Sequence, residues 1–261
     1  MPRLRAPARR ASAAAALLIL LGACSGVRQA RTQQADAHYR MATAYLQQTG
    51  DIRSELNRRA AYPELKTAIA LDGKNPEYRR LLGAIHLADR DFAAAEREIR
   101  EALRLSPSFP EARNDLGSIY AHQGRYQEAV REFRVAVENR SYATPQLARY
   151  NLAKASFQLG DYTEAADAYE RYLETEPGDA DARHNLGMCY VRLGRLADAE
   201  RAFAKVVETR TDALLTRYEL GMVLFKLARR PEAVAQFQAV SRLDPAGELG
   251  EQARTYLKIL R

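Results

Sequence analysis

Few residues in this chain could perform chemistry by their type and spacing. The sequence contains two cysteines, Cys24 and Cys189, and four histidines that stand far apart. It contains no HExxH, CxxC or GxSxG motif and no glycine-rich phosphate loop, and its carboxylates follow helical surfaces and turns. We therefore expect no catalytic residues, no metal site, no cofactor and no small-molecule substrate. The remaining question is what role the two cysteine thiols have.

Cys24 follows a stretch that is arranged like a secretory signal. Residues 1–10 carry four arginines, residues 11–21 are apolar apart from one serine, and two small residues precede the cysteine. This order of basic, apolar and small segments predicts a cleaved signal peptide. The apolar run has about half of the ~20 residues that a membrane-spanning helix needs, so we expect no transmembrane helix.

The four residues "LGAC" (21–24) resemble the lipobox of bacterial lipoproteins. In that class the cysteine sulfur carries a diacylglyceryl group, the chain is cut before it, and the new N-terminus is acylated. The resemblance implies a signal peptide over 1–23, lipid attachment at Cys24, and a lipidated N-terminus with a polar tether over 24–34. Serine rather than aspartate at position 25 implies the outer membrane, most simply its periplasmic face. An ordinary signal with a chance cysteine is the alternative.

Cys189 then has no cysteine left to pair with, so we expect no intramolecular disulfide. It falls inside an expected helix beside core positions, which predicts a buried thiol that packs as a small apolar group. The net charge of +7 falls to +3 without the arginines of the first ten residues, and acidic and basic residues alternate afterwards. This pattern argues against a nucleic-acid partner.

The rest of the chain is periodic. Leucines recur with spacings of 34, 36, 34 and 34 residues, and alanines follow in step with them, at Leu82, Leu116, Leu152, Leu186, Leu220 and Ala95, Ala129, Ala165, Ala199, Ala233. The period and the residue types resemble the tetratricopeptide repeat, a helix–turn–helix unit. Small residues at position 8 and large residues at position 24 of each unit predict a close approach of its two helices.

The repeat predicts an all-α fold, a right-handed superhelical solenoid of about six repeats closed by a C-terminal capping helix. We place the solenoid at 35–261, with repeats at about 35–75, 76–109, 110–145, 146–179, 180–213 and 214–247 and the cap at 248–261. The first repeat is about seven residues too long, and Pro63 should lie in the first turn of its second helix. The third repeat has two extra residues near "SYATP" (141–145).

Such a solenoid binds protein partners in a concave groove that is lined mainly by the first helix of each repeat. By resemblance, positions 2, 5, 6, 9, 12 and 13 face this groove. The expected partner-binding residues are Tyr39, Thr43, Leu46, Arg80, Leu81, Leu87, Tyr150, Asn151, Lys154, Phe157, Asn185, Met188, Tyr218, Met222 and Phe225. Aromatic residues and methionine there suit a peptide or an amphipathic helix, although each could instead pack between repeats. No repeat has the Lys and Asn pair at positions 5 and 9 by which chaperone-binding relatives hold a terminal carboxylate.

A narrower resemblance rests on the lipobox, the tether, the six repeats and the "YATP" insertion (142–145) before an Asn-Leu helix. Together they resemble the type IV pilus pilotin family of PilF/PilW and Tgl-type lipoproteins. The resemblance implies a non-enzymatic lipoprotein that binds a secretin subunit and assists its outer-membrane targeting and assembly. The long first repeat and Ala153, where a second glycine is common, depart from the pattern. The alternative is a repeat lipoprotein that acts as an adaptor for other periplasmic or outer-membrane assembly complexes.

Overall fold

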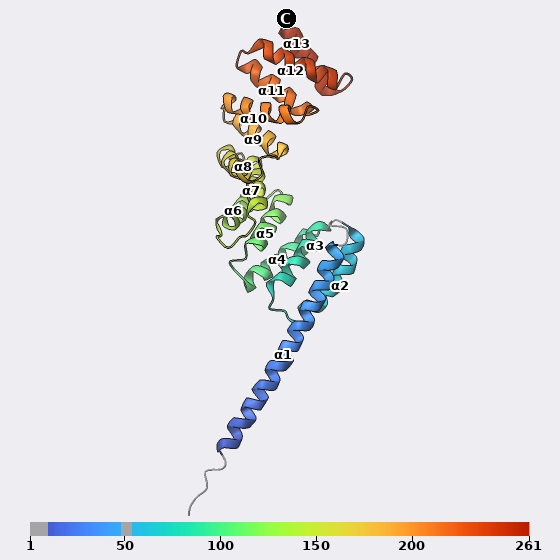
Figure 1. The fold of residues 1–261 in the computed structure, drawn as a ribbon, viewed down its shortest axis with the longest axis vertical. Helices are drawn as coiled ribbons and strands as arrows, with labels where there is room; N and C mark the ends of the chain where they lie inside the picture. Colours follow the sequence, from blue (N-terminus) through green and yellow to red (C-terminus); the bar gives the residue numbers. More distant parts are fainter. Residues whose placement is uncertain (1–9, 48–53, 261) are drawn as a thin grey trace, which may run out of the picture. The chain divides into compact units, whose positions relative to one another are not determined.

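The computed structural model describes residues 10–47 and 54–260, with side chains from residue 26 onward, and all its regular elements are α-helices (Figure 1). In chain order they are α1 (Arg10–Gln47), α2 (Glu55–Leu71), α3 (Pro76–Ala88), α4 (Phe92–Leu105), α5 (Pro110–His122), α6 (Tyr126–Glu138), α7 (Gln146–Leu159), α8 (Tyr162–Thr175), α9 (Ala180–Arg192), α10 (Leu196–Thr209), α11 (Leu214–Lys226), α12 (Arg230–Leu243) and α13 (Glu248–Ile259). The prediction of an all-α helical-repeat solenoid is confirmed.

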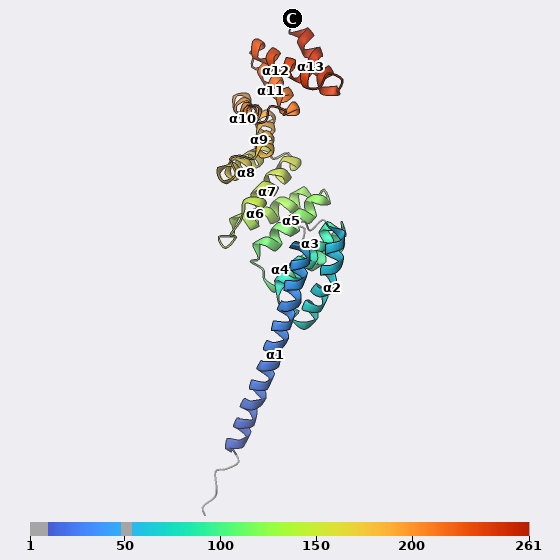
Figure 2. The same ribbon diagram turned by 45° about the vertical axis from the view of Figure 1, so that its right-hand side comes forward.

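The helices form consecutive pairs. The first helix of the second to sixth predicted repeats begins at the residue where we placed the repeat, and α13 begins at Glu248, the first residue of the predicted cap. The chain divides into two compact units, residues 1–115 and 116–261. Within the second unit, helices α6 to α12 each pack against the next helix in the chain (Figure 2).

The turns inside the repeats explain where the helices end. Gly124, Gly160 and Gly194 have φ values of +75°, +89° and +72°, a left-handed conformation that glycine adopts without steric cost. Arg90 and Ala228 occupy the same place in the second and sixth repeats with φ values of +62° and +58°. Glycine therefore closes the turn in three of the repeats, while Gly50 in the first repeat lies outside the described residues.

The pairing of small and large residues is also confirmed. A Cβ added to Gly117 would lie 2.7 Å from the ring of Phe133, and one added to Gly221 would lie 2.8 Å from the ring of Phe237. Carbon atoms prefer separations of about 3.5–4.0 Å, so these helices approach as closely as they do because a side chain is missing. Both rings are fully or almost fully buried.

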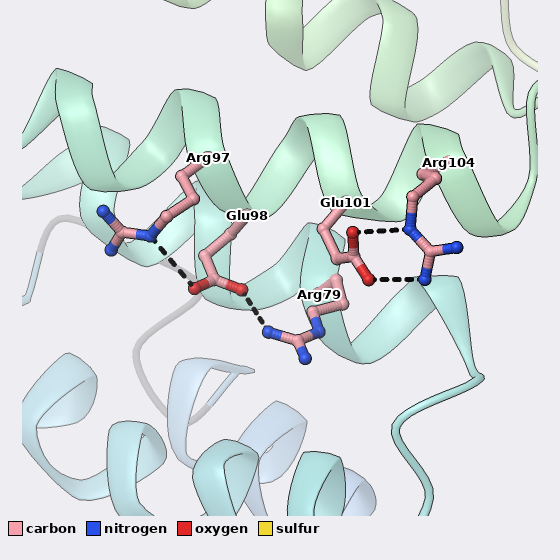
Figure 3. A network of polar contacts seen from close by, with 5 residues as sticks. All are labelled: Arg79, Arg97, Glu98, Glu101 and Arg104. Carbon is pink, nitrogen blue, oxygen red and sulfur yellow. Dashed lines mark hydrogen bonds and ion pairs between the residues drawn. The ribbon is translucent and has the colours of Figure 1, made fainter.

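A polar network fastens α3 to α4 (Figure 3). The carboxylate of Glu98, a residue only 8% exposed, accepts a hydrogen bond of 2.8 Å from Nη1 of Arg79, and Nε of Arg97 lies 3.9 Å from its other oxygen. Further along α4, Arg104 donates two hydrogen bonds of 2.8 Å to Glu101. A buried carboxylate is costly unless it is paired, so Arg79 is what allows Glu98 to lie inside.

Arg79 belongs to a periodic series that sequence reasoning did not single out. Arginine stands at the fourth position of the second to sixth repeats, at Arg79, Arg113, Arg149, Arg183 and Arg217. Three of the five reach back six residues to the turn between repeats: Arg217 donates to the carbonyl of Thr211, while Arg113 and Arg183 donate to prolines at the equivalent place. These bonds tie each turn to the helix that follows it.

One prediction about the first 75 residues is wrong, and the predicted tether is helical. Pro63 lies in the interior of α2 and not in its first turn, because α2 starts at Glu55. The helix is carried through this proline by packing, since Arg58 and Ala61 before it and Leu65 after it are buried. Residues 25–34, predicted as part of a polar tether, are helical and belong to α1, and the side chains of residues 26–34 are mostly exposed up to the buried Ala35.

Candidate functional site

A pocket of about 320 Å³ opens between α5, α6 and α7 in the unit of residues 116–261. We call it the α5–α7 pocket, and its lining consists of Ser118, Ala121, His122, Tyr126, Phe133, Asn151, Lys154, Ala155 and Gln158. Six of these nine residues stand at positions that the repeat pattern assigns to the groove, namely 9, 12 and 13 of the third repeat and 6, 9 and 13 of the fourth. The pocket is therefore a part of the predicted groove.

The pocket has an apolar floor and a polar rim. Phe133 and Ala155 are buried, whereas His122 and Lys154 are exposed. Nζ of Lys154 lies 5.5 Å from the centre of the Tyr150 ring, within the range of a cation–π interaction. The site thus offers a cation beside an aromatic ring, and an imidazole, at the rim of an apolar floor, an arrangement suited to binding.

Aromatic packing holds the groove face of α7 in place. The Tyr150 ring lies 5.9 Å from that of Tyr169 and 5.2 Å from that of Tyr172, and burial raises the pKa of Tyr150. Burial, and then the hydrogen bond of 2.9 Å that its hydroxyl donates to Asp179, raise the pKa of Tyr172 to about 12. Phe157 makes an edge contact with Tyr162 at 5.3 Å. The rings of Tyr150 and Phe157 on the groove helix α7 are thus packed against rings of α8.

The predicted groove residues of the fifth and sixth repeats are partly used by the fold. The Asn185 side chain hydrogen-bonds the hydroxyl of Tyr169, and Met188 and Met222 are half-buried. Tyr218 and Phe225 contact the ring of Tyr256 on α13, at centroid distances of 6.3 Å and 5.8 Å. At this end of the solenoid the cap takes up aromatic faces that we had assigned to a partner.

In the unit of residues 1–115, three predicted groove residues serve the structure. Leu46 is 8% exposed and lies in the core of the first helix pair, so its assignment to the groove is corrected. Tyr39 packs on Tyr78 with ring centres 5.0 Å apart. Nη1 of Arg80 lies 3.3 Å from a carboxylate oxygen of Asp115, and burial raises the pKa of that carboxyl although the guanidinium lowers it. Thr43, Leu81 and Leu87 are half-buried.

Some pocket residues were missed by sequence reasoning. Ser118, Ala121 and His122 belong to the third repeat, from which we had drawn no candidate, and Gln158 was passed over in the fourth. All four stand at groove positions, so applying the same positions to every repeat would have found them. Leu147, at position 2 of the fourth repeat, is 58% exposed and was missed for the same reason.

The two thiols differ in what the structure says of them. Cys189 is fully buried, and burial raises the pKa of its thiol to about 12, which confirms that it packs in the core. The side chain of Cys24 lies outside the described residues.

No helix within the described residues combines the length and apolarity that crossing a bilayer requires. Nor does that part of the chain bring three His, Cys, Asp or Glu residues together as a metal ion would need.

Comparison with known proteins agrees with the helix pairs and the period. Residues 81–144 and 156–215 each match a family model described as the tetratricopeptide repeat. The chain carries tetratricopeptide repeats, and its fold is an all-α solenoid of that type. Proteins with such repeats are in general scaffolds for protein interaction.

Solved structures of the same fold include PilF, PilW and YrrB. Pseudomonas aeruginosa PilF matches with a TM-score of 0.69 at 17% identity, covering 87% of this chain and 99% of PilF. PilW, described as a widely conserved type IV pilus biogenesis factor, matches with a TM-score of 0.65 at 21% identity, covering 84% of this chain and 98% of PilW. YrrB, described as a TPR protein with an unusual peptide-binding site, matches with a TM-score of 0.68 at 21% identity, covering 73% of this chain and 97% of YrrB. No curated protein sequence matches the chain.

Proposed function

We propose that this chain is a non-enzymatic binding protein whose first-helix groove holds a segment of a protein partner. The observation that carries the proposal is the α5–α7 pocket, because its lining coincides with groove positions of two adjacent tetratricopeptide repeats. The pocket joins an apolar floor to a polar rim, which is the composition of a site that recognises a peptide.

The partner we propose is a secretin subunit of a type IV pilus, so that the protein would act as a pilotin. The YATP insertion and the lipobox support this choice, as does the similarity of the fold to PilW over almost the whole of PilW. YrrB has a different description and matches the fold about as well, so an adaptor role in another assembly is the second candidate.

We propose further that lipid on Cys24 anchors the protein in the outer membrane. Two or three acyl chains hold a protein stably at a bilayer, whereas one does not. After cleavage before Cys24, ten helical residues at about 1.5 Å each would set the first buried residue, Ala35, about 15 Å from the anchor. Holding the groove at the membrane would raise the local concentration of secretin subunits there.

The anchor is tested by comparing Cys24→Ala with Cys189→Ala in cells fed radioactive palmitate. We expect Cys24→Ala to lose the label and leave the outer-membrane fraction, whereas Cys189→Ala keeps both. Retention of Cys24→Ala in that fraction would show that the anchor is elsewhere.

The partner is tested by deleting the gene and assaying heat-resistant secretin multimers on denaturing gels. Loss of the multimers, with recovery by the intact gene, is expected. Unchanged multimers and pili would rule out the pilotin role and favour the adaptor.

A further inference from the structure

The α5–α7 pocket differs in charge from the rest of the groove. None of its nine lining residues is acidic, and two of them are Lys154 and His122. Residues 116–122 of α5 and the whole of α7 contain no Asp or Glu, and the two acids of α5, Glu111 and Asp115, stand in its earlier turns. Acids at groove positions of the first helices stand outside the pocket lining, as at Glu77, Glu111, Asp115, Asp181 and Glu219. A local surplus of positive charge therefore marks this pocket.

Lys154 is a cation that the fold leaves without a counter-ion. Its side chain is exposed, and among the residues that the structure describes its one close charged or aromatic contact is the Tyr150 ring. Arg80, a cation at another groove position, is by contrast held by Asp115 and Glu77, each 3.3 Å away. A cation that rests on an aromatic face keeps its outer side available to an incoming carboxylate.

Apolar surface lies next to this charge. Phe133 and Ala155 form the pocket floor, and Leu147 is exposed on the same helix as Lys154. Leu147 and Lys154 are seven residues apart, which places them on one face of α7 about 10 Å from each other. An extended chain advances about 3.3 Å per residue, so a ligand would reach both with side chains about three residues apart.

We propose that the α5–α7 pocket docks an acidic peptide segment of a protein partner, with an Asp or Glu on Lys154 and an apolar side chain about three residues away over Leu147. The inference rests on the proposed function, because it names the chemistry of what the groove binds. It does not require the partner to be a secretin. Electrostatic complementarity of this kind selects the partner and speeds its association.

The test is selection of a displayed random dodecapeptide library on the intact protein, followed by affinity measurement with synthetic copies of the enriched peptides. We expect enrichment of peptides in which Asp or Glu stands near an apolar residue. Their affinity should fall about tenfold or more in Lys154→Glu, and should weaken with rising salt. Ala121→Trp, which blocks the pocket without changing charge, should reduce binding comparably. Lys205→Glu makes the same charge change on the exposed face of α10 and should leave binding within about twofold.

The outcomes separate the inference from the proposed function. If enriched peptides bind Lys154→Glu and Ala121→Trp as well as they bind the wild type, the acidic docking site is wrong. Binding that is then lost in Met188→Lys, on α9, would preserve a peptide-binding groove at another place. A selection that enriches no peptide would overturn both the groove function and the inference. If Lys154→Glu and Lys205→Glu lower the peptide affinity equally, the protein's net charge explains the loss, and this result would also overturn the inference.

Discussion

The capping helix α13 packs on the last repeat through the ring of Tyr256, and removing this ring should expose part of the predicted groove. The Tyr256 ring lies nearly parallel to that of Phe237, with centroids 5.0 Å apart and an angle of 11° between them. It also makes edge contacts with Tyr218 and Phe225. We therefore expect Tyr256→Ala to loosen α13 and uncover these rings.

The size of the effect follows from burial and ring geometry. A fully buried aromatic side chain removes about 150–250 Å² from water, and Tyr256 is half-buried, so about 100 Å² is at stake. At about 25 cal/mol per Å² this area contributes about 2.5 kcal/mol. The stacked pair with Phe237 adds about 0.5–1.5 kcal/mol. We expect Tyr256→Ala to lower the free energy of unfolding by about 3 kcal/mol.

The assay is denaturant unfolding combined with amide hydrogen exchange. Repeat solenoids can unfold locally from an end, so exchange should accelerate in α13, α12 and α11 before it does in α7. Tyr256→Phe keeps the ring and should cost much less. Lys258→Ala, an exposed change on the same helix, is the matched control. A loss below about 0.5 kcal/mol for Tyr256→Ala, with unchanged exchange in α13, would refute the idea that this ring holds the cap.

Three further predictions concern the repeat itself. Gly221→Ala should lower the free energy of unfolding by about 1 kcal/mol, because the clash of the new Cβ with the Phe237 ring outweighs the gain in helix propensity. Phe237→Leu should relieve that clash, so the effects of the two substitutions on stability should not add. Additive effects in the double variant would contradict the close-packing argument. Ala165→Leu should cost about 1–3 kcal/mol because Ala165 is fully buried, and an unchanged melting temperature would count against the repeat register. In chemical denaturation, Gly194→Ala should lower the free energy of unfolding by roughly 1–2 kcal/mol, because its φ is +72°. Gly178→Ala is the control: a new Cβ there meets open space, so the free energy of unfolding should change by less than about 0.5 kcal/mol.

The helix pairs could be predicted from the sequence because their causes are local and repeated. In each repeat a small residue faces a large one, and in several repeats a glycine closes the turn between the two helices. Each repeat therefore predicts the same helix–turn–helix pair independently of the others. Arg90 and Ala228 show that the turn keeps its left-handed shape even where glycine is missing. The fold is thus specified several times over, and one unfavourable residue does not change it.

Pro63 could not be placed correctly because its position depends on tertiary packing. Proline inside a helix costs about 3 kcal/mol, so a rule based on propensity puts it in a first turn. In the structure α2 extends eight residues before it, with Ala61 fully buried and Arg58 bonded to Asp89 at 2.5 Å. Contacts that come from another helix outweigh the local preference, and a single segment of sequence does not reveal them.

Assigning groove residues from repeat position has the same weakness, since position says where a side chain points but not what lies opposite. Arg80 and Lys154 are both cations at groove positions, yet only Arg80 is neutralised, by an aspartate 35 residues further along the chain. The same offset from Lys154 leads to Cys189, a buried thiol whose raised pKa keeps it uncharged. The counter-ion of a groove cation can therefore be sought one period along the sequence. By that criterion Lys154, unlike Arg80, has no carboxylate one period along the chain, which is why we propose that a bound peptide supplies it.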